Sequence, residues 1–160
     1  MVRLLASLIV ISALLLPGSA EAAYYRGGGD GIKVEMRVRD HKIVFARVAT
    51  KLYCSSGSGH KHTEPLRFYF GKDRRDATNA RSGSIPIGRR GYFRDEFESP
   101  PIEEDGFEES VFRGRVGTGR VGGDFRFRAF YEEDCRTGGY QRFAYGNKRK
   151  ERVHFRIRRL

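Results

Sequence analysis

The feature that most constrains the fold of this chain is a period-two alternation of apolar and charged residues in short runs. In the run IKVEMRVR, Ile32, Val34 and Met36 fall on one face of an extended strand, and charged residues fall on the other. Such runs recur about nine times between glycine-containing turns, and no window carries the apolar stripe of an amphipathic helix. The pattern predicts an all-β antiparallel β-sandwich, jelly-roll-like, with a closed antiparallel β-barrel as the alternative.

The run DFRFRAFY carries the same alternation with bulkier side chains. Phe125 and Phe127 lie on one face of the expected strand, and Arg126 and Arg128 lie on the other. We expect the phenylalanine face to fill the core and the arginine face to meet solvent, where charge discourages aggregation through strand edges. The strand stops shortly before Cys135.

The N-terminal segment has the layout of a secretory signal peptide. Arg3 precedes an apolar run over residues 4–16, and a proline-glycine pair and a small-residue site ending at Ala22 follow. This run is too short for a stable transmembrane helix, although a retained N-terminal anchor is the alternative. We therefore expect cleavage near Ala22 and a secreted or periplasmic protein without a transmembrane anchor. The remaining organisation would be a flexible leader over 23–31 and one domain over 32–160.

Two cysteines, Cys54 and Cys135, are the only ones in the chain. An even pair in an exported protein predicts one disulfide, and two unpaired thiols are the alternative. A bridge between positions this far apart would stabilise the fold by about 4 to 5 kcal/mol in the chain-entropy model.

The charge balance is strongly basic, with a formal net charge of +11 at pH 7. Such a protein is attracted to polyanions such as acidic polysaccharides, and the alternative is that the charge only maintains solubility. Guanidinium groups suit two-point contacts with carboxylate and phosphate. The predicted binding face consists of Arg126, Arg128, Arg156 and Arg158, with Lys148, Arg149 and Lys150 in the preceding turn.

Two short motifs are compatible with a cofactor or a metal. GTGRVG places Gly117, Gly119 and Gly122 in a G-x-G-x-x-G pattern, but the segment that follows alternates as a strand. A dinucleotide fingerprint needs a helix there, so we expect a hairpin turn and no bound dinucleotide or other cofactor. His60 and His62 are a weak metal-binding candidate, and solvated loop histidines are the alternative.

Acidic residues provide the alternative functional hypothesis, an exported polysaccharide hydrolase. Paired carboxylates run glycoside hydrolysis when they face one cleft. Charge balance on the surface of a basic protein is the simpler reading of these residues. No G-x-S-x-G nucleophile motif is present. The candidate carboxylates are Glu98, Glu103, Glu104, Glu108, Glu132 and Glu133.

The order of these motifs resembles small secreted bacterial β-sandwich domains of uncharacterised function. The residues that carry the resemblance are YCSSG (53–57), FYFG (68–71), IPIGRRGYF (85–93), FRGRV with VGGDFR (112–126) and CRTG (135–138). The resemblance implies a fold with a hairpin, a cysteine-ended strand and a second cysteine, and it supplies no active site. The basic segment from Lys148 onward departs from it. We expect an exported, non-catalytic domain that binds polyanionic envelope or extracellular polymers, with its oligomeric state left open.

Overall fold

The computed structural model describes residues 21–29, 31–71, 79–81, 83–99, 106–138 and 151–160. The expected signal peptide, apart from its last two residues, lies outside this part of the chain. Among the described residues, no helix has the length and apolar character needed to cross a membrane.

Strands make up most of the described chain, and antiparallel pairing dominates, with β4 and β5 as a parallel exception. A short 3-10 turn, η1 (Arg89–Gly91), precedes β7. The strands are β1 (Ala23–Gly29), β2 (Ile32–Arg39), β3 (Lys42–Ser56), β4 (Lys61–Gly71), β5 (Asn79–Arg81), β6 (Ile85–Pro86), β7 (Tyr92–Glu98), β8 (Phe107–Gly117), β9 (Arg120–Phe130), β10 (Glu133–Arg136) and β11 (Val153–Arg159).

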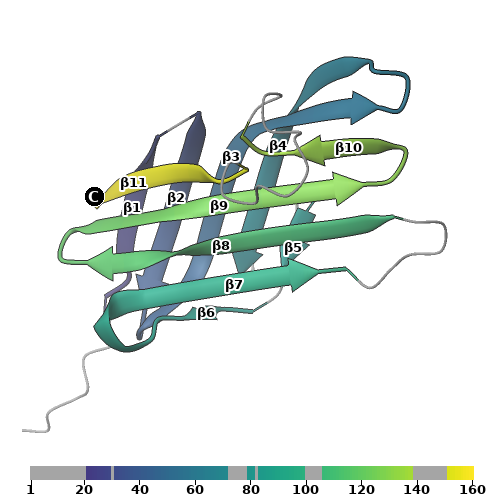
Figure 1. Cartoon of the computed structure of the whole chain (residues 1–160). Helices are drawn as coiled ribbons and strands as arrows, with labels where there is room; N and C mark the ends of the chain where they lie inside the picture. Colours follow the sequence, from purple (N-terminus) through teal and green to yellow (C-terminus); the bar gives the residue numbers. More distant parts are fainter. Residues whose placement is uncertain (1–20, 30, 72–78, 82, 100–105, 139–150) are drawn as a thin grey trace, which may run out of the picture.

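Six of these strands close into an antiparallel barrel in the order β3, β2, β1, β11, β9, β10 and back to β3. Closure depends on the length of β3, because its first half pairs with β2 and its last residues pair with β10. β4 and β5 extend the sheet beyond β3, whereas β8 and β7 extend it beyond β9, so that β7–β9 cross in front of β1–β4 (Figure 1). The all-β antiparallel prediction is confirmed, and the architecture is the barrel alternative.

The core lies between the two crossing layers. Phe68 of β4, Phe112 of β8, Phe125 of β9 and Phe155 of β11 are almost fully buried. Their rings pack edge to face and in stacks, with a centroid distance of 5.6 Å between Phe68 and Phe125 and 5.5 Å between Phe112 and Phe155. The inward positions predicted from alternation, such as Phe125, therefore occupy the core.

The disulfide prediction is confirmed. Cys54 of β3 and Cys135 of β10 are directly opposite each other across the strand pair, with their Cα atoms 4.0 Å apart and their sulfurs bonded. The bridge lies where β10 completes the barrel wall, so it ties together two strands that no short turn connects.

The prediction of a flexible leader over 23–31 is wrong for most of that segment, since Ala23–Gly29 forms β1. Its sequence lacks the alternation of apolar and charged residues, but its backbone is hydrogen-bonded on both edges, to β2 and to β11. Glycine permits this close packing, because a Cβ atom at Gly28 would lie 2.1 Å from the Ile32 carbonyl oxygen.

The glycine motif around Gly117 and Gly119 forms the tight turn between β8 and β9, as predicted. Gly119 has a φ of 69°, a left-handed conformation that suits glycine. A strand, β9, follows the motif, so the helix that a dinucleotide fingerprint requires is not formed there.

Candidate functional site

The outward face of the barrel wall around β1, β11 and β9 combines arginines with glycines. Gly28 of β1 is opposite Arg156 of β11, which is in turn opposite Gly122 of β9. Two residues further along each of β1 and β11, Arg26 is opposite Arg158. Because outward positions alternate along each strand, these residues share one surface.

Three adjoining hollows follow this surface across the strands, and we call them together the basic trough. The first, of about 480 Å³, lies over β1, β2 and β3 and includes Gly28. The second, of about 570 Å³, spans Gly28 and Gly122. The third, of about 550 Å³, continues from Gly122 over β8 and β7. Shared residues join the hollows, so they form one shallow path that crosses seven strands.

The trough exists because two central floor positions lack side chains. At Gly28 the close approach of the neighbouring turn requires glycine. At Gly122 it does not, because a Cβ atom would have only the Phe155 carbonyl oxygen, at 3.8 Å, as a neighbour. Gly122 also lacks the positive φ that favours glycine. Packing therefore leaves room for a side chain at Gly122, and its absence keeps the floor open.

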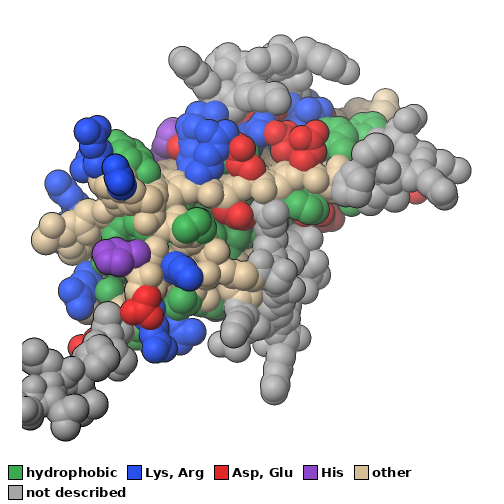
Figure 2. All heavy atoms as spheres, turned by 90° about the horizontal axis from the view of Figure 1, so that it is seen from below, with side chains coloured by type: hydrophobic (Ala, Val, Ile, Leu, Met, Phe, Trp, Pro, Cys, Tyr) green, Lys and Arg blue, Asp and Glu red, His purple; other side chains and the backbone are tan. Residues whose placement is uncertain are grey.

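Cationic side chains outnumber carboxylates along the trough. Glu35 is shared by Arg26, at 3.2 Å, and Arg47, at 2.9 Å, so two guanidinium groups face a single carboxylate. Asp124 accepts two hydrogen bonds from Nε of Arg113. Figure 2 shows basic side chains spread along one end of the molecule. The lysine and arginine residues that line the trough are Arg26, Lys33, Arg47, Arg94, Arg113, Arg115 and Arg156, against Glu35 and Asp124.

Only some residues of the predicted binding face are exposed on the surface. Arg156 and Arg158 are exposed on β11, as the alternation indicates. Arg126 has the same outward parity but is only 5% exposed, which corrects the prediction that it meets solvent. Lys148, Arg149 and Lys150 lie outside the described residues.

Arg126 is buried because carboxylates from two other segments cover it. Its guanidinium pairs with Glu109 of β8 and, at 3.5 Å, with Glu151, which precedes β11. Glu151 also accepts a hydrogen bond of 3.0 Å from Arg136 of β10, and Asp134 completes the pairing of Arg136. We call Glu109, Arg126, Asp134, Arg136 and Glu151 the buried ion cluster.

Arg128, the other predicted binding residue of β9, is half-buried, and its guanidinium already contacts other side chains. Its guanidinium lies 3.4 Å from Asp134 and 4.8 Å from the centroid of the Phe107 ring. These contacts position Arg128 as part of the wall beside the buried ion cluster. It therefore cannot reach a ligand in the basic trough without breaking them.

The hydrolase carboxylates that the structure describes lie away from the basic trough. Of the six candidates, Glu103 and Glu104 lie outside the described residues. The described ones, Glu98, Glu108, Glu132 and Glu133, line none of the three hollows of the trough. Outside this set, a side-chain hydrogen bond from Arg94 is the main reason that the pKa of Glu96 lies below its ordinary value.

The two histidines singled out in the sequence differ in their surroundings. The rings of His60 and His62 are 5.8 Å apart, but His60 is exposed. His62 lies on β4 beside the disulfide, with its Nε2 atom 3.3 Å from carboxylate oxygens of both Glu64 and Glu133. Proximity to Cys54 and Glu133 across three strands could not be read from the HKH motif itself.

Comparisons of the chain with protein-family models, with curated proteins and with solved structures found no match. The resemblance to small secreted β-sandwich domains therefore stays a prediction.

Proposed function

We propose that this protein binds extended anionic polymers in the basic trough, without catalysing a reaction on them. The observation that carries the proposal is that, among the described residues, seven lysine and arginine side chains and two carboxylates line a glycine-floored path. This assignment moves the binding residues away from Arg126 and Arg128 and toward β1, β2, β3, β7, β8 and β11.

The shape of the trough favours a chain over a small anion. It crosses seven strands, β3, β2, β1, β11, β9, β8 and β7. Neighbouring strands are about 4.8 Å apart, so the path is roughly 29 Å long. A single carboxylate or phosphate would contact only a small part of it, whereas a polymer would add contacts along its length. Affinity should therefore rise with oligomer length until the oligomer spans the path.

The side chains on the trough retain unused hydrogen-bond donors. Glu35 has one carboxylate for Arg26 and Arg47, and the contacts of Arg113 with Asp124 use Nε alone among its nitrogens. An arginine carries five N–H donors in a planar fork that matches carboxylate, sulfate and phosphate oxygens. A polyanion can therefore bind these arginines without first displacing all of their internal partners.

The polymer class follows from the expected location. A protein exported through a signal peptide would meet acidic polysaccharides of an envelope or matrix, and we take these as the ligands. Attraction of this kind is largely screened charge, so binding should weaken as salt increases.

The test compares two triple variants with the same change of net charge. The trough variant replaces three cations of the basic trough by serine: Arg26, Lys33 and Arg156. The control variant replaces three exposed cations elsewhere by serine: Arg39, Lys42 and Lys51. Heparin and polygalacturonate are the anionic probes, with dextran as the neutral one, and titration calorimetry gives the affinity. If each lost contact is worth about 1 kcal/mol, the trough variant binds roughly a hundredfold more weakly.

The control triple variant should keep its affinity within about threefold, because it loses only long-range attraction. Equal weakening in the two triple variants would contradict the trough and leave only net charge as the cause. Affinity for heparin that stays constant from low to high salt would contradict the electrostatic mechanism itself.

A further inference from the structure

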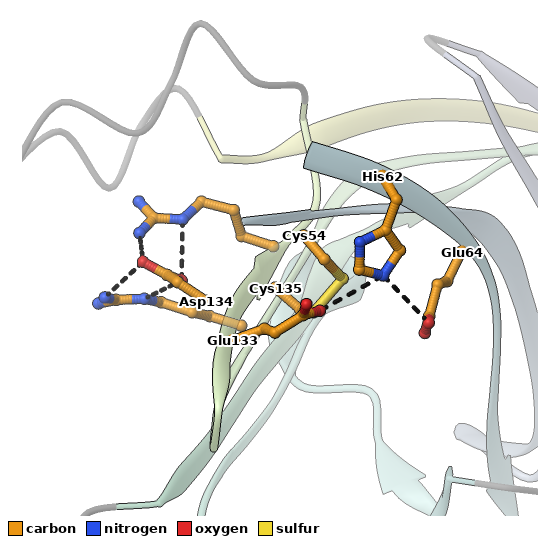
Figure 3. The surroundings of a disulfide bond; sticks show 8 residues. Cys54, His62, Glu64, Glu133, Asp134 and Cys135 are labelled. Atoms are coloured by element: carbon orange, nitrogen blue, oxygen red, sulfur yellow. Dashed lines mark hydrogen bonds and ion pairs between the residues drawn. A yellow bond between two sulfur atoms is a disulfide. The ribbon is translucent and has the colours of Figure 1, made fainter. Parts of the chain in front are cut away.

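The disulfide is surrounded by metal-ligating side chains from three strands. Cys54 of β3 is opposite Cys135 of β10 on one side and opposite His62 of β4 on the other. Glu133 lies two residues before Cys135 on β10. Figure 3 shows the His62 ring between Glu64 and Glu133, beside the two sulfurs. This arrangement gathers two sulfurs, an imidazole and carboxylates at one edge of the barrel.

Two overlapping sets of ligand atoms meet at Cys54. Ligand atoms of Cys54, Cys135 and Glu133 lie within 4.8 Å of one another, and those of Cys54, His62 and Glu64 do so as well. Tetrahedral zinc holds sulfur at about 2.3 Å and nitrogen at about 2.0 Å, which separates neighbouring ligand atoms by roughly 3.3 to 3.8 Å. The two sets share Cys54, so both lie around the same sulfur and are close to the size of a zinc coordination shell.

His62 provides an independent observation, because one of its ring nitrogens is available to a metal. Its Nδ1 atom is buried and has no hydrogen-bond partner among the described residues, whereas its Nε2 atom faces two carboxylates. Histidines that bind metals commonly use one ring nitrogen for the ion and donate the other N–H to a carboxylate. The free Nδ1 and the carboxylate-bound Nε2 of His62 reproduce that division.

We propose that reduction of the disulfide opens a zinc site formed by Cys54, Cys135, His62 and Glu133, with Glu64 orienting the imidazole. A dithiol supplies two electrons and two protons, breaks the S–S bond and becomes a disulfide itself. Zinc then binds the two thiols as thiolates, and two protons leave to solvent. In the oxidised protein the sulfurs are bonded to each other, so this site is closed.

The experiment uses the full chain, oxidised or reduced with dithiothreitol and then freed of it by gel filtration without oxygen. Co²⁺ serves as a spectroscopic probe for zinc. The reduced protein should bind one Co²⁺ per chain, with a thiolate-to-cobalt charge-transfer band and strong tetrahedral d–d bands. The oxidised protein should show neither band. Absence of the charge-transfer band in the reduced protein would overturn the proposal.

The matched variants are His62→Gln and His60→Gln, because the two histidines are neighbours and only His62 lies at the sulfurs. His62→Gln should weaken Zn²⁺ binding by about 10- to 100-fold, and His60→Gln should leave it unchanged. Equal affinities in the two variants would show that the cysteines bind metal without the folded site.

Thermal unfolding of the reduced protein settles whether the site belongs to the fold. A ligand that binds the native state raises the unfolding temperature, and one that binds the unfolded chain lowers it. Added Zn²⁺ should raise the unfolding temperature of the reduced wild type and do so much less for His62→Gln. If added Zn²⁺ lowers the unfolding temperature of the reduced wild type or leaves it unchanged, the proposal is refuted. A reduced chain that is already unfolded would refute it as well, because the site would then not exist.

Discussion

The most demanding prediction concerns the replacement of Glu151 by glutamine. Glu151 is about 5% exposed and connects Arg126 of β9 with Arg136 of β10. Glutamine keeps the shape of the side chain but removes its charge. The backbone carbonyl of Glu151 would still accept the 2.6 Å hydrogen bond from the Thr137 hydroxyl, so the change is confined to the charged contacts.

The loss of unfolding free energy depends on the ion pairs that Arg126 and Arg136 keep after the replacement. Removing one partner of a buried ion pair costs about 3–5 kcal/mol, because a buried charge is left uncompensated. Arg126 keeps Glu109 and Arg136 keeps Asp134, so we expect the lower end, about 3 kcal/mol. With a urea dependence of about 2 kcal/mol/M, the unfolding midpoint would fall by about 1.5 M.

Equilibrium urea unfolding followed by tyrosine fluorescence measures this loss. The matched control is Glu96→Gln, which removes the same charge from an exposed pair with Arg94 and should cost less than about 1 kcal/mol. If Glu151→Gln costs no more than Glu96→Gln, the buried ion cluster does not stabilise the barrel and the reasoning is refuted.

Two further predictions concern the bridge and a surface carboxylate. Replacing both Cys54 and Cys135 by alanine should lower the free energy of unfolding by about 4 kcal/mol, since the bridge closes a loop of 81 positions, and an unchanged urea midpoint would contradict this. Because the folded pKa of Glu96 is lowered, its stabilising contribution is present above its unfolded pKa and is lost as pH falls through the folded value. Glu96→Gln should therefore be slightly less stable than wild type at neutral pH and equal at acidic pH, and a difference that grows on acidification would contradict the assignment.

Alternation predicted which way most side chains face, because that property is local. Ile32, Val34 and Met36 are buried, and Arg156 and Arg158 are exposed, as a period of two requires. These positions need only the knowledge that one face of a strand packs against a core.

Long-range pairing explains what alternation missed. Arg126 faces outward by parity, yet Glu109 and Glu151 arrive from segments 17 and 25 residues away and cover it. The closure of the barrel likewise depends on the four-residue strand β10 pairing with both β3 and β9. No local pattern in a segment so short indicates that it has two neighbours.

The basic trough was missed for a different reason. Its floor is defined by the absence of side chains at Gly28 and Gly122, which the sequence alone presents as loose or turn-forming residues. The register between β1, β11 and β9 is what aligns these glycines on either side of Arg156. A basic composition indicated an anionic partner, but the place for it depends on that register.

Binding in the basic trough can be tested by filling its floor without changing any charge. Gly122→Leu adds a side chain where the backbone tolerates one, and Gly57→Leu, in the β3–β4 turn, is the matched control because nothing lies within 4 Å of its added Cβ atom. Heparin affinity at low salt is measured for both variants and the wild type. We expect at least about tenfold weaker heparin binding for Gly122→Leu, equivalent to 1.4 kcal/mol, with an unchanged urea midpoint, and wild-type affinity for Gly57→Leu. Equal affinities in all three proteins would contradict binding in the trough.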